Sequence, residues 1–375
     1  MQVFFSPWSA NTDGKPSQRP IDGYVAVLGT GGTIAGQARG GAVNDHLDYK
    51  SGEVGIDALI GDLAHRVLVA HGDVMSVGVG VQCEQVAQID SKNASWDFLW
   101  RLAASTAQAL AEPQCMGVVV THGTDTLEET AWFLSCVLGD RLAAKPVVLT
   151  CAMRPASALS PDGPQNMVDA ITVAAYGGAS GLQVCVAGAC WSGQSVQKVH
   201  PYRLNAFDGA DTGPVAYVEG GRVRPVVVST PSRGDRPAFG YAAARTALDS
   251  VMAGGPVPTQ AWVELVVHTA ASNVAVFDAL KQVGVQGVVL MTTGNGTVND
   301  QWLAALQAHS TAGWPVWCAS RCQSGFVVAR HSAVRVETSP AQWQTSDGLP
   351  VVLGLSGVKT RISMLLWLLD RTDSL

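Results

Sequence analysis

A polar stretch at residues 121–130 lies between two apolar runs, and it constrains the fold more than any other part of the chain. The preceding run, residues 117–120, has the length and composition of a buried strand, and the following run, residues 131–138, predicts a buried helix. The polar stretch therefore lies on a strand-to-helix turn, at the carboxyl end of a strand. Because open α/β sheets bind their ligands at such turns, we expect a ligand site here.

Helix capping alone could explain some of these polar residues. Asp125 with Glu128, and Thr126 with Glu129, both have the spacing of a capping box. For a lone motif of this kind, capping would be the simplest explanation. A second polar turn of the same kind, nearer the N-terminus, favours a ligand site instead.

This second turn is rich in glycine and threonine. It spans residues 29–36 and follows the apolar run 24–28 directly. A dinucleotide fingerprint would need glycine where Ile34 stands, and the Gly-Lys-Ser/Thr of a phosphate-binding loop is missing, so nucleotide binding is disfavoured. What remains is a turn that brings a hydroxyl to a strand end. Thr33 and Thr124 therefore predict one shared cleft with two candidate nucleophiles.

The rest of the pattern alternates between strands and helices, which predicts parallel strands joined by right-handed crossovers. In the first half of the chain the expected strands are residues 24–28, 86–93, 117–120, 146–151 and 182–187, with helices at 96–111 and 167–176.

We predict an α/β protein with a larger N-terminal domain, whose mostly parallel sheet is flanked by helices, and a smaller C-terminal α/β domain. Glycine and proline between the two indicate a linker. The predicted parts are an N-terminal arm (1–22), the larger catalytic domain (23–215), a linker (216–259) and the smaller domain (260–375).

Composition narrows the class of protein. The 375 residues are 47% hydrophobic and 14% charged, which describes a globular chain rather than a disordered one. A net charge of −6 without a basic cluster argues against nucleic acid as a partner. No apolar run approaches the roughly 20 residues of a membrane span, so we expect no membrane partner. With Met1 as the native start and no secretory signal, we expect a cytoplasmic protein. The eight cysteines lack metal-ligand spacing, which predicts free thiols and no zinc.

Two motifs resemble the signatures of a known family. Residues 30–36 and 122–130 are similar to the two signature motifs of the bacterial-type L-asparaginases (asparaginase/glutaminase family). Residues 152–155, with 162–164 and Asn166 after them, resemble a further stretch of that family. The likeness runs from the first predicted strand to the C-terminus, and it is stronger in the first half of the chain. The order of the three motifs makes the resemblance specific.

The resemblance implies an amidohydrolase that releases ammonia from the side-chain amide of L-asparagine or a close analogue. Its catalytic residues would be Thr33 and Tyr49, acting with a second group formed by Thr124, Asp125 and Lys198. Amides resist hydrolysis, so a hydroxyl must be activated to form an acyl-enzyme, which water then hydrolyses. Lys198 can act as a base only if burial favours its neutral amine. Which threonine attacks first stays open, and the scheme needs no metal or organic cofactor.

The substrate-binding residues implied by the resemblance are Ser91, Gly123, Thr124 and Asp125, with Lys92 beside them. Ser91 matches the serine that holds the substrate's α-carboxylate, and Asp125 can pair with its ammonium. Secreted asparaginases commonly have glutamine after this serine, whereas Lys92 follows it here. A cation beside a substrate ammonium is unfavourable. Either Lys92 points away, or the substrate is an asparagine-like amide whose amino group is absent, blocked or differently held.

The family also implies a homodimer or homotetramer, in which a neighbouring subunit completes each site. The partner's asparagine and glutamate of secreted asparaginases align with Ala271 and, less securely, with Ser332. These departures concern the substrate more than the reaction.

Two other functions remain open. The ammonia-releasing subunit of a tRNA-dependent amidotransferase carries the same threonine, aspartate and lysine set, but it usually has an added N-terminal domain, which 22 residues cannot form. A catalytically weak amino-acid-binding relative is the other alternative. Retention of Thr33, Thr124, Asp125 and Lys198 together argues against it.

Overall fold

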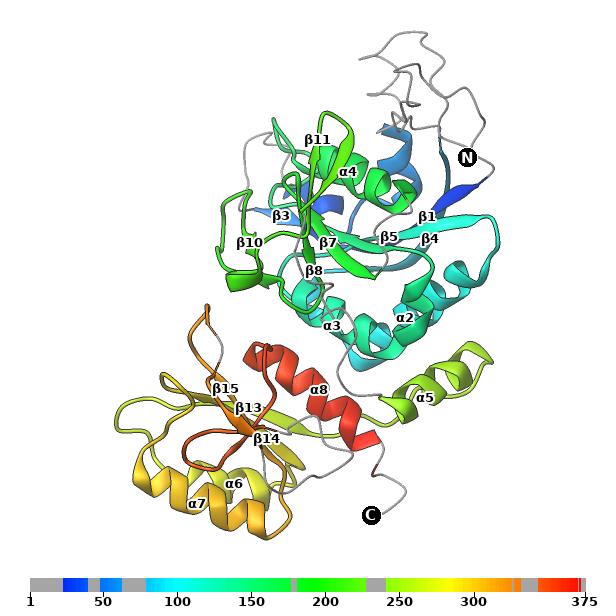
Figure 1. The fold of residues 1–375 in the computed structure, drawn as a ribbon. Coiled ribbons are helices and arrows are strands. Elements are labelled where there is room, and N and C mark those ends of the chain that lie inside the picture. The colour runs from blue at the N-terminus through cyan, green and yellow to red at the C-terminus, as the bar shows by residue number, and fades with distance from the viewer. Residues whose placement is uncertain are drawn as a thin grey trace, which may run out of the picture. The chain divides into compact units, whose positions relative to one another are not determined.

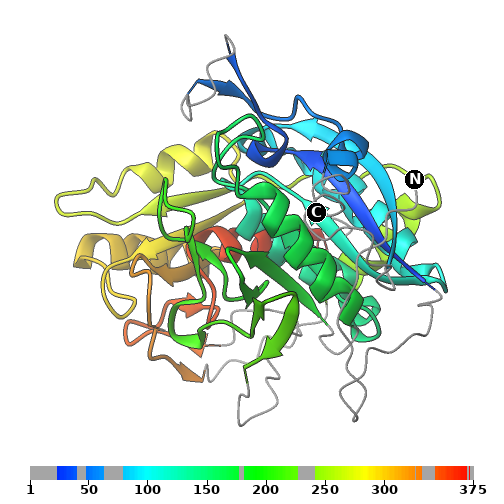
Figure 2. The same ribbon diagram turned by 90° about the horizontal axis from the view of Figure 1, so that it is seen from above.

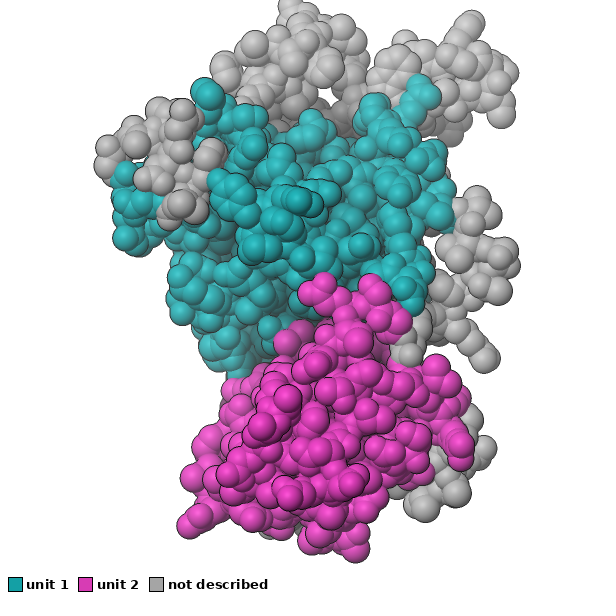
Figure 3. Space-filling view, turned by 90° about the vertical axis from the view of Figure 1, so that its left-hand side faces the viewer, with its two compact units in different colours: residues 1–235, 251–255 teal, residues 236–250, 256–375 magenta. Residues whose placement is uncertain are grey.

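The computed structural model describes residues 23–39, 48–62, 79–176, 181–226, 241–325, 327–331, 343–369 and 371. The chain forms two compact units (Figure 3), residues 1–235 with 251–255 and residues 236–250 with 256–375. The expected arm at 1–22 and Ser332 lie outside the described residues. None of the helices in the described ranges is long and apolar enough to cross a membrane.

The first unit is built on an eight-stranded sheet with the strand order β12-β11-β8-β7-β6-β5-β1-β4. Five neighbouring strands run parallel, as the alternation of strands and helices predicts. They are β4 (Gly80–Ile89), β1 (Tyr24–Gly31), β5 (Cys115–Thr121), β6 (Val147–Thr150) and β7 (Leu182–Val186). The predicted α/β class and mostly parallel sheet are confirmed.

Helices cover both faces of this sheet (Figures 1 and 2). One face carries α4 (Gly163–Tyr176) and a helix over residues 56–62. The other is covered by α2 (Trp96–Ala111) and α3 (Leu127–Leu138). Because both faces are buried, the central strands are apolar almost throughout.

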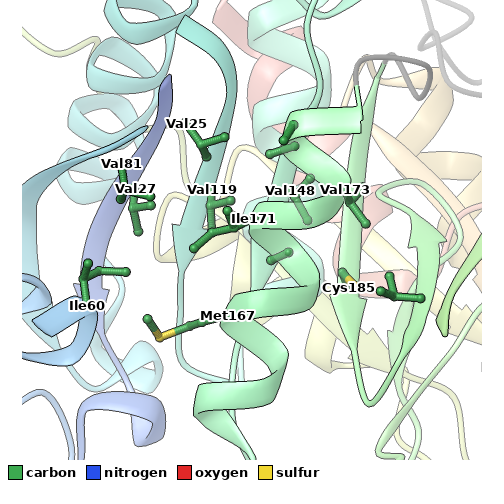
Figure 4. Close-up of a cluster of buried hydrophobic side chains, with 14 of the residues drawn as sticks. Val25, Val27, Ile60, Val81, Val119, Val148, Met167, Ile171, Val173 and Cys185 are labelled. Carbon is green, nitrogen blue, oxygen red and sulfur yellow. The ribbon is translucent and has the colours of Figure 1, made fainter. Parts of the chain in front are cut away.

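Successive side chains of each strand point to opposite faces of the sheet, so they pack against different helices. Val25, Val27, Val119 and Val148 pack toward α4, where they meet Met167 and other apolar side chains (Figure 4). Their neighbours in the strands, such as Leu28 and Val120, are equally buried and point to the opposite face. This two-sided core holds the carboxyl ends of β4, β1 and β5 in fixed register.

Three antiparallel strands extend the sheet beyond β7. They are β8 (Ala189–Ser192), β11 (Ala216–Glu219) and β12 (Arg222–Pro225). Residues 216–225 were expected within a linker, but Gly220 and Gly221 adopt positive φ and close a tight hairpin. Ala216 and Val218 are buried in the core beneath α4, so this part of the expected linker belongs to the sheet.

Short elements flank the sheet. Two small antiparallel ribbons pair β2 (Gln37–Ala38) with β3 (Tyr49–Lys50) and β9 (Gln197–Lys198) with β10 (Phe207–Asp208). Lys198 therefore lies in a ribbon separate from the main sheet, shortly after its strand β8. The short 3₁₀-helices in the described part of this unit are η1 (Thr33–Ala35), η3 (Ser91–Asn93), η4 (Gly139–Ala143) and η5 (Ala210–Thr212).

The second unit has its own six-stranded sheet, with the order β13-β14-β15-β18-β17-β16. The first four strands in that order, β13, β14, β15 and β18, pair in parallel. The other two, β17 and β16, pair antiparallel with their neighbours. Trp302 and Phe277 anchor a core on one face, and α8 packs on the strands as well. The strands are β13 (Val263–Val267), β14 (Gly287–Thr292), β15 (Val316–Ser320), β16 (Arg330–His331), β17 (Trp343–Gln344) and β18 (Pro350–Val351), and the helices α6 (Val276–Gln282), α7 (Asp300–Thr311) and α8 (Gly357–Leu369). Helix α5 (Ala242–Met252) precedes β13.

Candidate active site

Three polar turns of the first unit meet at one edge of its sheet. Thr33 follows β1, Ser91 follows β4 and Thr124 follows β5. These strands are neighbours and parallel, so their carboxyl ends lie side by side. The turns are also in direct contact, since Gly32 packs on the backbone of Gly123 and Gly123 packs on Ser91. The three turns therefore share one edge of the sheet.

Thr33 and Tyr49 form the first hydroxyl pair of this edge. Thr33 Oγ1 lies 2.8 Å from the Tyr49 hydroxyl, and the Thr33 residue is only 7% exposed. Tyr49 belongs to β3 and its ring packs against the backbone at Gly36. The single turn η1 and the β2–β3 ribbon therefore bring together two residues that are 16 positions apart in the sequence.

Lys198 joins the second hydroxyl to a carboxylate. Its Nζ donates to Thr124 Oγ1 at 2.8 Å and to Asp125 Oδ1 at 2.6 Å. The Thr124 hydroxyl donates a longer bond, 3.4 Å, to the same carboxylate. The side chain of Lys198 is 17% exposed, whereas that of Asp125 is 53% exposed. Asp125 therefore keeps an accessible carboxylate surface while its Oδ1 holds the lysine.

Ser91 links the turn after β4 to the turn after β5. Its Oγ accepts from the Asp125 backbone N–H at 3.2 Å, and its carbonyl accepts from Thr126 Oγ1 at 2.8 Å. Thr126 is the N-cap residue of α3, but its side chain makes no capping hydrogen bond. The capping box predicted for Thr126 with Glu129 is therefore absent, because the threonine hydroxyl is bonded to Ser91.

Lys92 lies at the rim of this arrangement. Its ammonium is 3.0 Å from Asp90 Oδ2, and its side chain is 66% exposed. The hydrogen bond and negative charge of Asp90 raise the pKa of Lys92, with smaller contributions from Asp125 and Tyr49. Lys92 is thus paired with a carboxylate of its own turn, and it lies within electrostatic reach of the two site residues.

The chain matches the models of the N-terminal and the C-terminal domain of one protein family. Residues 24–227 match the model "Asparaginase, N-terminal", and residues 262–375 match "Glutaminase/Asparaginase C-terminal domain". The chain belongs to the asparaginase/glutaminase family. It is an amidohydrolase of the L-asparaginase type, as the two signature motifs predicted.

Individual relatives and a solved structure are also similar to this chain over most of its length. A glutaminase-asparaginase of Pseudomonas fluorescens biotype A is 30% identical over 310 residues, which cover 82% of this chain and 78% of the relative. A probable periplasmic L-asparaginase of Haemophilus influenzae is 31% identical over 316 residues, 80% of this chain and 78% of the relative. The crystal structure of a probable cytoplasmic L-asparaginase from Campylobacter jejuni superposes with a TM-score of 0.69, at 29% identity, over 92% of this chain and 95% of that one.

A buried histidine of this asparaginase-family site was missed in the sequence. The Nδ1 atom of His122 lies 2.8 Å from the Gly123 carbonyl oxygen, and its Nε2 atom lies 3.1 Å from Thr130 Oγ1. Burial lowers the pKa of His122 to about 4, against a smaller opposing effect of its bond to Gly123. The only signal in the sequence is a histidine directly after a buried strand, at the start of the second signature motif.

The family-like stretch after β6 stabilises the neighbouring strand end. Both Asp162 carboxylate oxygens accept backbone N–H groups, from Met153 at 3.0 Å and from Arg154 at 2.9 Å. Asn166 bridges the Cys151 carbonyl and the Ala187 N–H. These residues therefore order the backbone beside the site.

Proposed function

We propose that the chain hydrolyses the side-chain amide of L-asparagine, or of a close analogue, through a threonine-bound acyl-enzyme. The observation that carries this proposal is the pair of threonine hydroxyls at adjacent strand ends, each hydrogen-bonded to a titratable side chain. Thr33 is bonded to a phenol, and Thr124 is bonded to an ammonium–carboxylate pair. Each hydroxyl therefore has a polar partner that can exchange a proton with it.

In the first step, Thr33 Oγ1 attacks the amide carbon while its proton moves toward the Tyr49 hydroxyl, 2.8 Å away. The carbon–nitrogen bond then breaks, the nitrogen takes up the proton that Thr33 released through the Tyr49 hydroxyl, and ammonia leaves. The product is an ester between Thr33 and the substrate's side-chain carbonyl. Water hydrolyses this ester in the second step, which releases the carboxylate and restores the threonine hydroxyl.

Thr124, Lys198 and Asp125 form the second catalytic group of this proposal. Their short contacts can take up a proton from the water that attacks the ester, or from Thr124 itself if that threonine attacks first. The backbone N–H of Thr124 has no acceptor among the described residues. An N–H of this kind can stabilise the negative oxygen of the tetrahedral intermediate.

Substrate binding is proposed for Ser91 and Asp125. Ser91 Oγ already accepts an N–H from Asp125, so its own proton can be donated to a substrate carboxylate. The exposed part of the Asp125 carboxylate can accept a substrate ammonium. Lys92 is paired with Asp90, so its charge does not exclude L-asparagine, and a substrate without a free amine can bind as well.

An ammonia-release assay tests this function. The purified chain is incubated with L-asparagine, L-glutamine, N-acetyl-L-asparagine and succinamate, which lacks the amine. We expect release from at least one four-carbon amide. Thr33→Ala and Thr124→Ala should each abolish it and keep the fold, whereas Thr311→Ala is the control, because that hydroxyl bonds to its own helix in the second unit. Near-normal turnover by both site variants would rule out the threonine mechanism.

A second candidate is the ammonia-releasing component of a tRNA-dependent amidotransferase. One component of the glutamyl-tRNA(Gln) amidotransferase of Methanopyrus kandleri is 28% identical over 385 residues, which cover 96% of this chain and 75% of the relative. A chain that hydrolyses free amides at full rate without tRNA or a partner would argue against this role. Amide hydrolysis that requires tRNA and a partner protein would establish it.

We also propose that the enzyme is a cytoplasmic homodimer or homotetramer. The Campylobacter jejuni protein is named as a probable cytoplasmic L-asparaginase, although the Haemophilus influenzae relative is named as a probable periplasmic one. The family resemblance suggests a neighbouring subunit at each site. Analytical ultracentrifugation tests the assembly, and a fully active monomer of 39.1 kDa would contradict it.

A further inference from the structure

We propose that His122 is a positioning residue for amide hydrolysis, because its imidazole sets the orientation of the peptide between Gly123 and Thr124. The inference rests on the proposed function, since the peptide belongs to the same site. The imidazole acts through the backbone: its two ring nitrogens bond to Gly123 and Thr130. It is therefore a support for the reacting groups rather than one of them.

The partners of the two nitrogens define where the imidazole proton lies. Nδ1 is 2.8 Å from the Gly123 carbonyl oxygen, which can only accept, so Nδ1 carries the proton. In the neutral ring Nε2 then has a lone pair, and it accepts the Thr130 hydroxyl at 3.1 Å. Both nitrogens are satisfied, which fixes the ring at its two ends.

This anchoring determines the direction of the next peptide N–H. In a planar trans peptide, the carbonyl of one residue and the N–H of the following residue point in opposite directions. Because the Gly123 carbonyl is held toward the imidazole, the Thr124 N–H is turned away from it. No described residue accepts that N–H, so it can receive a substrate oxygen. A donor oriented before the substrate arrives needs no reorganisation during the reaction.

Burial and packing keep the His122 imidazole neutral and fix its orientation. His122 and Thr130 are each 1% exposed, and the Phe98 ring centroid lies 5.9 Å from that of His122. Thr130 lies in α3, so the bonds run from a helix through the imidazole to the turn that carries Thr124. Burial also lowers the pKa of His122 to about 4, so the same tautomer persists throughout the neutral range.

Three substitutions separate positioning from packing. His122→Asn keeps an N–H donor at the position of Nδ1, since both atoms are two bonds from Cβ. His122→Gln keeps one at the position of Nε2, three bonds from Cβ, and His122→Leu keeps neither. We expect the Asn variant to retain kcat within about fivefold, and the Gln and Leu variants to lose roughly 30- to 100-fold in kcat with KM within about threefold.

Loss of packing alone predicts a different result. All three variants would then have a lower melting temperature, and kcat per folded molecule would be similar among them. A Leu variant within threefold of the wild-type kcat, or an Asn variant as slow as the Leu variant, would overturn the proposal. If the His122 variants do not fold, Thr130→Val is the second test, because it removes the hydroxyl but keeps the shape. It should lower kcat several-fold without changing KM.

A spectroscopic measurement tests the geometry without any substrate. In the ¹⁵N-histidine NMR spectrum of the whole chain, which has eight histidines, the signal missing from the His122→Asn spectrum identifies His122. We expect a neutral ring protonated at Nδ1 from pH 6 to pH 8. A ring protonated at Nε2 would overturn the inference whatever the activity. An inactive wild type would instead contradict the proposed function, so the two failures are distinguishable.

Discussion

Gly32 and Gly123 lie against each other with no room for a side chain. A Cβ atom on Gly32 would come within 2.5 Å of both the Cα and the N of Gly123, and Gly32 also has a φ of 78°. We predict that Gly32→Ala lowers stability by about 1–3 kcal/mol from the backbone strain alone. By pushing the two threonine turns apart, it should also lower turnover roughly a hundredfold. Thermal denaturation and ammonia release measure the two effects.

Gly61→Ala is the matched control for this change. Gly61 lies in the helix over residues 56–62, and a Cβ there would meet nothing within 4 Å. It should leave turnover unchanged and stability equal or slightly higher. If Gly32→Ala behaved like this control, the two turns would not be in the close contact described.

Contact between these turns was predictable because each follows an apolar strand in a βα repeat. The prediction needed only that the strands be parallel and neighbouring, and β1 and β5 are both. Lys198 could not be placed in the same way, since it lies in a separate ribbon that no sequence pattern revealed. Its place beside Thr124 depends on how the chain returns after β8.

Other features depend on contacts between particular residues, which the amino-acid composition does not specify. The glycines at 220 and 221 suggested a linker, because the turn of a hairpin and a flexible segment have the same composition. Lys92 was identified as a departure from the family, but its pairing with Asp90 arises from the single turn η3. His122 and Thr130 meet only because the turn between them brings α3 back to the end of β5.

Asp169 makes the stability of the first unit depend on pH. Burial raises the pKa of Asp169 to about 6, from 3.8, although a hydrogen bond from Gln165 opposes this. The folded state therefore binds the proton more tightly than the unfolded state. The cost of ionisation is absent below pH 3.8, grows as the pH rises toward 6, and then stays constant. Asp169→Asn should therefore stabilise the protein by up to about 3 kcal/mol at pH 8, and by about half as much at pH 5.

Chemical denaturation at the two pH values measures this difference. Asp211→Asn is the control, because Asp211 is exposed and should give no gain that grows with pH. A gain from Asp169→Asn that is equal at pH 5 and pH 8 would show that the carboxyl is not held protonated by burial.

The hairpin between β7 and β8 can be stabilised by one substitution. Ala187 and Gly188 form its two-residue turn, with φ values of 52° and 75°. A turn with positive φ at both positions favours Asn-Gly, and alanine is strained there. We predict that Ala187→Asn, at an exposed position, raises the free energy of unfolding by about 0.5–1 kcal/mol. Ala189→Asn, just inside β8, should give no gain. Equal effects of the two changes would mean that the turn strain is negligible.

Lys92 is the residue at which substrate preference can be tested most directly. Its ammonium pairs with Asp90 at the rim and lies within electrostatic reach of Asp125, which is proposed to hold the substrate amine. Lys92→Gln removes this charge and introduces the residue usual in secreted asparaginases. We predict that kcat/KM for L-asparagine rises by up to about fivefold, because an exposed, salt-screened charge has a modest effect.

Most of that gain should appear in KM, since the ammonium is remote from the bond that breaks. Succinamate, which has no amine, is the internal control, and its kcat/KM should not rise. The preference should therefore shift toward the substrate with a free ammonium, and the shift should diminish at high salt, where the charge is screened. An unchanged or lower kcat/KM for L-asparagine would mean that Asp90 already neutralises Lys92 fully. The substrate amine would then be held independently of this lysine.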